Sequence, residues 1–243
     1  MKASKARRPA KVGEERVWAD GRTHRKTAAG KWETVGKQPV RPPAPTVGKG
    51  ISVGFDKSFP AHLRPVVEEA VGALPRRVRE ALGGVRFVGA PLAEKSKTLL
   101  GYYVPGSLPF IKVFSHYKVR GKVHEVTATE IRTTVAHEAG HAFDYHLGKG
   151  KPASTTSSKM SGLRHAWWVG NKRLTNLPDT DYRRRIAEYF TSDSKLGTPH
   201  GQQEVFAEMV AHASGLSGGP RMDVLVVHFP EARAIAGRLA ERG

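Results

Sequence analysis

The sequence contains no cysteine among its 243 residues. Disulfide bonds are therefore excluded, as are thiolate nucleophiles and thiolate metal ligands, so any metal ion must be held by imidazole and carboxylate groups. The chain also lacks a run of about 18 apolar residues, and its basic beginning is not followed by an apolar segment. We therefore expect neither a membrane span nor a signal peptide, and the lack of cysteine suits a reducing cytoplasm.

Acidic residues are scarce: 22 Asp and Glu stand against 40 Lys and Arg, which gives a formal net charge of +18. Such an excess favours an acidic partner, namely nucleic acid, an anionic membrane surface or an acidic protein. Residues 1–50 contain 13 Lys or Arg and 4 Asp or Glu, so this fifth of the chain carries half of the excess. The overall composition, with 39% hydrophobic residues, is typical of a globular protein.

The composition divides the chain into two parts. Residues 1–50 are rich in Lys, Arg, Gly and Pro, and the Pro-rich segment 39–45 is typical of an extended linker. Within this basic tail, the segment 16–35 has the pattern of a small hairpin. Residues 51–243 are long enough for one ordinary domain, and we expect them to form it.

Hydrophobic periodicity predicts an α+β domain. Apolar residues at helical spacing predict a helix over 60–82, which Pro75 divides. Thr127 and Glu130 form a capping-box pattern that begins a long helix ending at Gly148. Further helices are predicted over 180–190, over 202–214 and from Pro230 onward. Strands are predicted over 85–88, 99–104, 110–114 and 122–126. We interpret these strands as an antiparallel sheet.

The segment His137-Glu138-Ala139-Gly140-His141 carries the strongest chemical signal. Two histidines four residues apart project from one face of a helix, so His137 and His141 can bind the same zinc ion. Glu138 lies beside that face, close enough to accept a proton from a metal-bound water without being a ligand itself. The pattern predicts a catalytic metal site, and Gly140 allows another segment to approach the helix closely.

A catalytic zinc ion keeps three protein ligands, so a third must come from elsewhere in the chain. The metzincin pattern would need Gly at position 144 and His at position 147, but the sequence has Asp144 and Leu147, which excludes that class. The predicted helix 202–214 offers Glu204 and Glu208, which are one turn apart on the same side. From the residues alone, either carboxylate can be the third ligand.

Three segments together resemble a known family. Ile111-Lys112-Val113, the segment 137–144 and Glu204-Val205-Phe206-Ala207-Glu208 resemble the catalytic domain of anthrax lethal factor and related gluzincin metallopeptidases. The resemblance implies a zincin-like core, in which an antiparallel or mixed sheet is followed by the active-site helix and a C-terminal helical part. The two helical motifs are its diagnostic parts.

The resemblance also implies roles for individual residues. Glu204 would be the third zinc ligand, and Glu208 and Asp144 would be supporting carboxylates. In that family a tyrosine shortly before the ligand glutamate faces the metal, but this sequence has no tyrosine at the equivalent position. We therefore consider His200 and Tyr189 as candidates for the group that donates a hydrogen bond to the oxyanion.

The sequence thus predicts a zinc-dependent endopeptidase. A metal-activated water would attack the peptide carbonyl while Glu138 accepts its proton as the general base. We interpret the predicted strand 110–114 as a sheet edge, to which an extended protein or peptide substrate can add as another strand. The basic surface favours acidic substrates.

A different class of function is also compatible with the sequence. The basic tail places Trp18 and Trp32 among Lys and Arg residues, a combination that can bind phosphates and stack on bases. The alternative hypothesis is a nucleic-acid-associated or phage structural or morphogenesis protein that uses a zincin-like fold as a scaffold. The two hypotheses imply a cytoplasmic protein or one that is carried in a virion or injected.

Overall fold

The computed structural model of the chain describes residues 11, 13, 15–17, 23–34, 53–91, 100–119, 121–148, 161–176, 190, 200–216 and 220–241. The chain separates into two compact units, Met1–Ala44 and Pro45–Gly243. Most of the described residues belong to the second unit. Within the described part of the chain, no helix has both the length and the apolar character needed to cross a membrane.

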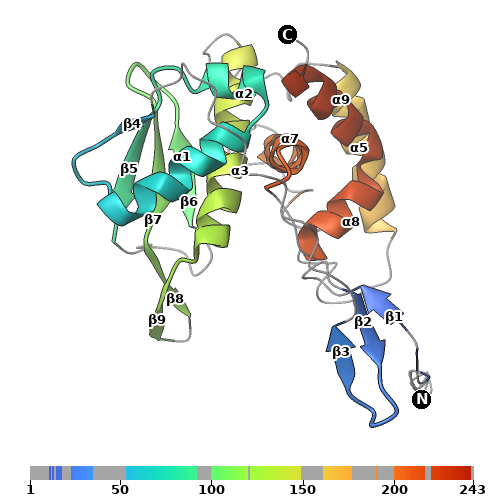
Figure 1. Cartoon of the computed structure of the whole chain (residues 1–243). Coiled ribbons are helices and arrows are strands. Elements are labelled where there is room, and N and C mark those ends of the chain that lie inside the picture. The colour runs from blue at the N-terminus through green and yellow to red at the C-terminus, as the bar shows by residue number, and fades with distance from the viewer. Residues whose placement is uncertain are drawn as a thin grey trace. The chain divides into compact units, whose positions relative to one another are not determined.

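The first unit contains a three-stranded antiparallel sheet with the order β1-β2-β3 (Figure 1). Its strands are β1 Glu15–Val17, β2 Thr23–Lys26 and β3 Trp32–Thr34. In the turn between β2 and β3, the Thr27 amide donates to the Lys31 carbonyl at 2.8 Å, and Gly30 has a φ of 75°. Glycine adopts that left-handed conformation without steric cost. The sheet occupies the segment in which the sequence predicts a small hairpin.

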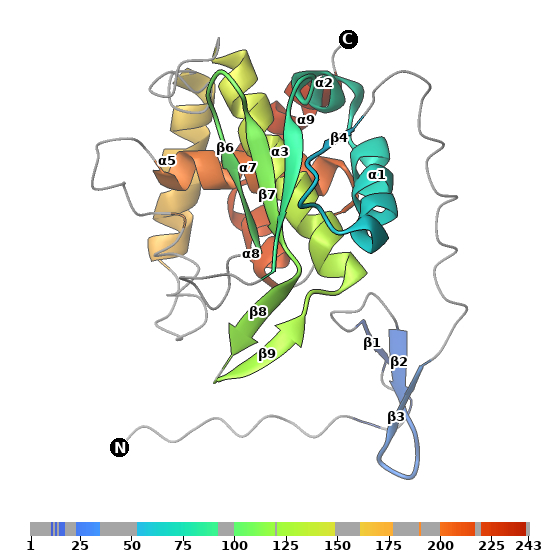
Figure 2. The ribbon, with the colours of Figure 1, turned by 90° about the vertical axis from the view of Figure 1, so that its left-hand side faces the viewer.

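The second unit contains a four-stranded sheet with the order β4-β5-β7-β6 (Figure 2). Its strands are β4 Gly54–Phe55, β5 Arg86–Ala90, β6 Gly101–Val104 and β7 Phe110–Phe114. Both β4 and β7 run parallel to β5, whereas β6 pairs antiparallel with β7. The domain is therefore α+β as predicted, but its sheet is mixed, and the interpretation of these strands as an antiparallel sheet is wrong.

The connections explain the strand directions. The helices α1 Arg64–Ala73 and α2 Arg76–Ala81 lie between β4 and β5, and a crossover of that length returns the chain in the same direction. Residues 105–109 are too few for a crossover, so β6 and β7 form an antiparallel hairpin. Pro75 separates α1 from α2, which confirms the predicted break, because proline cannot donate the backbone hydrogen bond of a continuous helix.

The predicted strand 122–126 does not join this sheet. It forms β9 Lys122–Glu125, which pairs antiparallel with β8 His116–Val119 in a separate two-stranded ribbon. All four residues of β9 are exposed. A strand without a buried face has nothing to pack onto the core, which explains why the ribbon projects from the domain in Figure 2.

The long helix α3 Ala128–Leu147 crosses the middle of the domain, and its capping box is confirmed. The Thr127 side chain accepts from the Glu130 amide at 3.2 Å, and the Glu130 carboxylate accepts from the Thr127 amide at 2.8 Å. An apolar stripe that includes Ile131, Val135 and Ala139 is fully buried. Helix α3 packs against α1, α2 and the strands β6 and β7 on one side and against a C-terminal helix on the other.

The C-terminal part is helical. Its described helices are α5 Ser161–Thr175, α7 His200–Ala213, α8 Pro220–His228 and α9 Pro230–Glu241. Figure 1 shows α7 between α3 and the group formed by α5, α8 and α9. The predicted helix 180–190 lies outside the described residues except for Phe190, whereas those over 202–214 and from Pro230 are confirmed.

Helices α3 and α7 approach each other closely at Gly140. A Cβ atom added at Gly140 would lie 2.6 Å from Ala207 Cα and 2.8 Å from the Ala207 carbonyl oxygen, so no larger residue fits without moving a helix. Ala207 is fully buried. This contact sets the distance between the face of α3 that carries His137 and His141 and the face of α7 that carries Glu204.

We expect Gly140→Ala to destabilise the protein by about 1–3 kcal/mol, because overpacking forces backbone to shift. A matched control is Gly237→Ala in α9, where a Cβ would have no atom within 4 Å. That change should instead stabilise by about 0.5–1 kcal/mol, since alanine loses less conformational entropy than glycine in a helix. Urea unfolding of the two variants measures both effects, and equal unfolding midpoints would contradict the close contact.

Candidate metal centre

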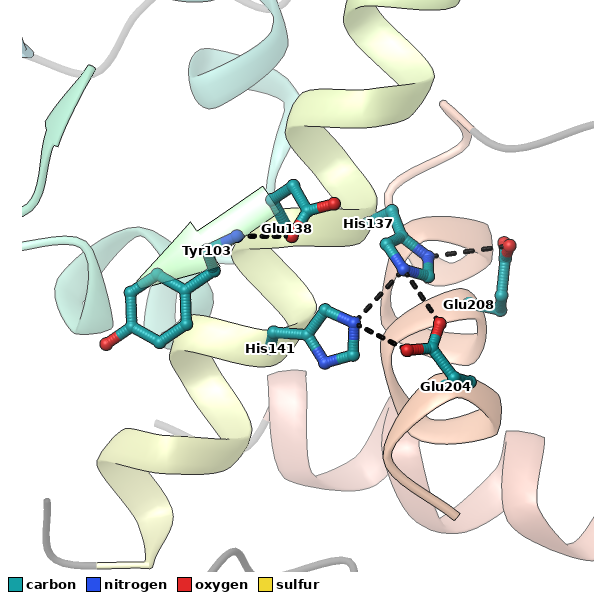
Figure 3. Close-up of polar contacts among 6 residues, drawn as sticks. All are labelled: Tyr103, His137, Glu138, His141, Glu204 and Glu208. Atoms are coloured by element: carbon teal, nitrogen blue, oxygen red, sulfur yellow. Dashed lines mark hydrogen bonds and ion pairs between the residues drawn. The ribbon is translucent and has the colours of Figure 1, made fainter. Parts of the chain in front are cut away.

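Two helices bring the three predicted ligands together. Helix α3 presents His137 and His141 one turn apart, and α7 presents Glu204 opposite them (Figure 3). One ligand atom from each residue lies within 4.8 Å of the other two. The Nε2 atoms of the two histidines are 3.1 Å apart, and Glu204 Oε2 and Oε1 lie 3.2 Å and 3.5 Å from Nε2 of His137 and of His141.

These separations fit a single ion. Four ligands about 2.0–2.1 Å from a tetrahedral zinc ion are separated from one another by about 3.3 Å. The three donor separations observed, between 3.1 and 3.5 Å, bracket that value. The donor set contains imidazole and carboxylate only, which suits a divalent metal ion such as zinc. The residues therefore form a group that can hold a metal ion.

Glu208 supports His137 from the side away from this group. Its Oε1 lies 3.4 Å from His137 Nδ1, one turn further along α7 than Glu204. Burial acts to lower the pKa of His137, but the carboxylates of Glu208 and Glu204 more than offset it, so that pKa lies well above its usual range. A bound cation would oppose the extra proton. The Glu208 carboxylate lies 3.4 Å from Nδ1, outside hydrogen-bond geometry, and its charge would favour the Nδ1–H tautomer that leaves Nε2 free to bind.

Glu204 is an ionised carboxylate in a buried position. Only 5% of the residue is exposed. Burial acts to raise its pKa, but the hydrogen bonds and charges of His137 and His141 together hold that pKa well below its usual range. A buried negative charge between two imidazoles is stable only when a positive charge accompanies it, either a proton on a histidine or a metal ion.

Glu138 is buried next to the two histidines and is held by the sheet. Its Oε2 accepts a hydrogen bond from the Tyr103 amide at 2.8 Å, and 6% of the residue is exposed. Strand β6 can lie this close to α3 because Gly101 has no side chain: a Cβ there would be 2.6 Å from Thr134 Cγ2. Figure 3 shows Glu138 on the β6 side of His137, opposite Glu204.

Two tyrosines near the site, Tyr103 and Tyr145, are not among the residues predicted from the sequence. Their rings meet edge to face with centroids 6.1 Å apart, and burial together with Tyr145 raises the pKa of Tyr103 to about 12. The Tyr103 ring lies on the far side of His141 from Glu204 in Figure 3. The sequence could have indicated Tyr145, because it follows His141 by four residues and therefore lies on the same face of the helix. The sequence could not have indicated Tyr103, because its contact with Glu138 depends on how strand β6 is placed in the sheet.

The remaining predicted residues are placed as follows. Asp144 is buried on α3, with 1% of the residue exposed. His200 is the first residue of α7, but its side chain lies outside what the structure describes, and Tyr189 lies outside the described residues altogether. The predicted edge strand 110–114 is wrong, because β7 is paired on both sides and β6 forms the edge next to Glu138.

No protein-family model matches the chain, and no curated protein matches it. The functional interpretation therefore depends on the donor set itself: two imidazoles and a buried carboxylate that can share one ion, with a second buried carboxylate beside them.

Proposed function

We propose that the protein is a zinc-dependent endopeptidase with a zincin-like core. The observation that carries the proposal is a group of three ligands, among the residues that the structure describes, beside Glu138, a buried carboxylate that is not part of that group. A structural zinc site is normally closed by four protein ligands, whereas a catalytic site keeps three and leaves a position for water. The resemblance of the three segments to gluzincin metallopeptidases supports the same assignment.

The proposed ligands are His137, His141 and Glu204. A bound zinc ion would supply Lewis-acid chemistry, lowering the pKa of a water molecule and polarising the substrate carbonyl. Glu138 accepts the proton of the attacking water at its carboxylate and delivers it to the leaving nitrogen. The Tyr103 amide keeps the Glu138 carboxylate in place, since its hydrogen bond occupies one oxygen and leaves the other available.

The edge strand β6 supports a peptide as the substrate. Tyr103 directs its amide away from β7 and toward Glu138, so the outer edge of β6 runs past the general base. An extended peptide that adds to this edge would bring its own carbonyl groups next to Glu138. The strand beside which the substrate would bind is therefore β6, and not β7 as predicted from the sequence.

The ligand assignment predicts a ranking of zinc affinity. Glu204→Ala should weaken zinc binding by more than Glu208→Ala, because the first change removes a ligand and the second only a partner of His137. Loss of such a supporting carboxylate typically costs about 10–100-fold in metal affinity. Competition with a chromogenic chelator measures both variants. The opposite ranking would make Glu208 the ligand, and a native chain that binds no zinc would remove the metal site.

The role of Glu138 predicts a separation of metal binding from activity. Glu138→Gln should retain one zinc per chain and keep the hydrogen bond from Tyr103, but lose at least about 100-fold in peptide hydrolysis because an amide cannot accept the proton. The control is Glu125→Gln on the exposed strand β9. Metal analysis and mass spectrometry of a digested peptide library provide the two readouts, and full activity of Glu138→Gln is incompatible with general-base catalysis.

The same preparation tests the nucleic-acid hypothesis. A protein that holds no zinc, cleaves no peptide in the library and binds DNA with a steep dependence on salt concentration would favour that alternative. Zinc-dependent cleavage that Glu138→Gln abolishes would favour the peptidase.

A further inference from the structure

Helix α5 has an exposed face of cationic and aromatic side chains. His165 and Trp168 stack with centroids 6.2 Å apart, and the Lys172 ammonium lies 3.8 Å from the centroid of the Trp168 ring. Arg164 is exposed on the same helix. Trp168 is 49% exposed although it is among the largest apolar side chains of the protein. An exposed aromatic ring that contacts an ammonium group and an imidazole is typical of a binding site rather than of a core.

This face lines a cavity of about 590 Å³. Its lining residues among those described are Arg164, His165, Trp167, Trp168 and Gln202. None of the five is acidic, and their surface toward the cavity is mostly apolar. The volume falls in the range of small-molecule and side-chain sites, about 300–1,000 Å³.

Two of the lining residues carry polar groups. Trp167 is held because its indole N–H donates to the Phe190 carbonyl at 2.8 Å. The Gln202 Oε1 atom is buried and has no hydrogen-bond partner, and Gln202 lines the cavity. A buried amide group without a partner is costly, and a ligand that offers a backbone amide would satisfy it.

The cavity and the metal centre use opposite sides of one helix. Gln202 precedes Glu204 by two residues, which is about 3 Å along the axis and roughly 200° around it. At the same end of α7, a Cβ on Gly201 would lie 3.3 Å from Trp167 Nε1, so α5 and α7 are in close contact there. A helix is about 10 Å wide, so the two sites are separated by about the width of one helix.

We propose that this cavity, the α5–α7 pocket, binds an acidic segment of the peptide substrate through one large apolar or aromatic side chain. The inference rests on the proposed peptidase function. The apolar side chain would enter between the tryptophans, and neighbouring carboxylates would meet Arg164, His165 and Lys172 at the rim. Glu231 interacts electrostatically with His165, but both of its carboxylate oxygens are bound by Arg173, at 2.6 and 2.7 Å.

The shape of the site favours a peptide over a nucleic acid. Single-stranded nucleic acid is bound along a groove whose cations follow the phosphate backbone over several nucleotides. Here the cations cluster around one cavity, and the unsatisfied group at the pocket is a single amide, which pairs well with a peptide backbone.

The test measures binding to the zinc-loaded full chain carrying Glu138→Gln, so that it does not depend on turnover. The probes are fluorescein-labelled peptides with the cores Asp-Glu-Phe-Glu-Asp, Asp-Glu-Ala-Glu-Asp and Lys-Arg-Phe-Arg-Lys, and a labelled single-stranded oligo(dT), all followed by anisotropy at one ionic strength. The first peptide should bind at least about ten-fold more tightly than the other probes, as expected for an aromatic anchor.

The variants Trp168→Ala and Arg164→Glu should each weaken binding of the first peptide by at least about ten-fold. Val227→Ala and Lys122→Glu are the matched controls, since Val227 is 67% exposed outside the pocket and Lys122 is exposed on β9. Both controls should bind within about two-fold of the parent chain. Circular dichroism confirms that the variants fold.

Equal binding by Trp168→Ala and its parent would overturn the pocket, as would a preference for oligo(dT) that Trp168→Ala removes. Cleavage assays on the native chain separate this outcome from failure of the peptidase proposal. If Trp168→Ala does not affect peptide hydrolysis, the peptidase proposal stands and the pocket proposal fails. Pocket-dependent binding without any zinc-dependent hydrolysis would leave a peptide-binding site and remove the activity.

Discussion

The close contact between Gly140 and Ala207 is the constraint on which the rest of the site depends. The histidines of α3 belong to one turn of one helix, but Glu204 is more than 60 residues away in the sequence and must be brought in by packing. Helix axes approach to about 8–10 Å depending on the side chains between them. With glycine on α3 facing alanine on α7, the helices meet backbone to backbone, and donor separations of 3.1 to 3.5 Å result. The fold therefore sets the geometry of the metal centre through its smallest residues.

The electrostatics of the site follow from this packing. The chain has a formal net charge of +18, yet three glutamates are buried around the two histidines. Glu138 lies on α3 with the histidines, and Glu204 and Glu208 lie on α7. Burial acts to raise the pKa of Glu204 and to lower that of His137, yet the pKa of Glu204 is held low by the two histidines and that of His137 is held high by the neighbouring carboxylates. Each carboxylate has a separate partner: Glu204 faces both Nε2 atoms, Glu208 faces Nδ1 of His137, and Glu138 faces the amide of Tyr103. The group can therefore accommodate a positive charge at its centre, which is the property that a metal site requires.

The sequence predicted what local physics controls. The capping box of Thr127 and Glu130, the break at Pro75 and the spacing of His137 and His141 are set by neighbours within one helical turn, and each is found in the structure. The sheet was predicted less well, because strand pairing depends on how the connections cross. The composition of β7 is that of any strand, and β7 lies inside the sheet because it pairs with β5 on one side and with β6 on the other. Local sequence could not decide whether Glu204 or Glu208 is the metal ligand, because both lie on the same face of α7. They differ in which nitrogen of His137 they contact, Nε2 for Glu204 and Nδ1 for Glu208.

Helix α7 connects the candidate metal centre and the proposed α5–α7 pocket. Its inner side carries Glu204 and Glu208 against α3, and its first turn also lines the α5–α7 pocket through Gln202. Residues 205–211 of α7 are almost completely buried, so the helix is fixed over its whole central length and cannot rotate without exposing apolar surface. A peptide bound on one side of such a helix is positioned relative to the other side, because the helix is rigid. The spacing between the pocket and the candidate metal centre is therefore fixed. In the proposed peptidase, this fixed spacing would select where along an extended substrate the reactive carbonyl falls.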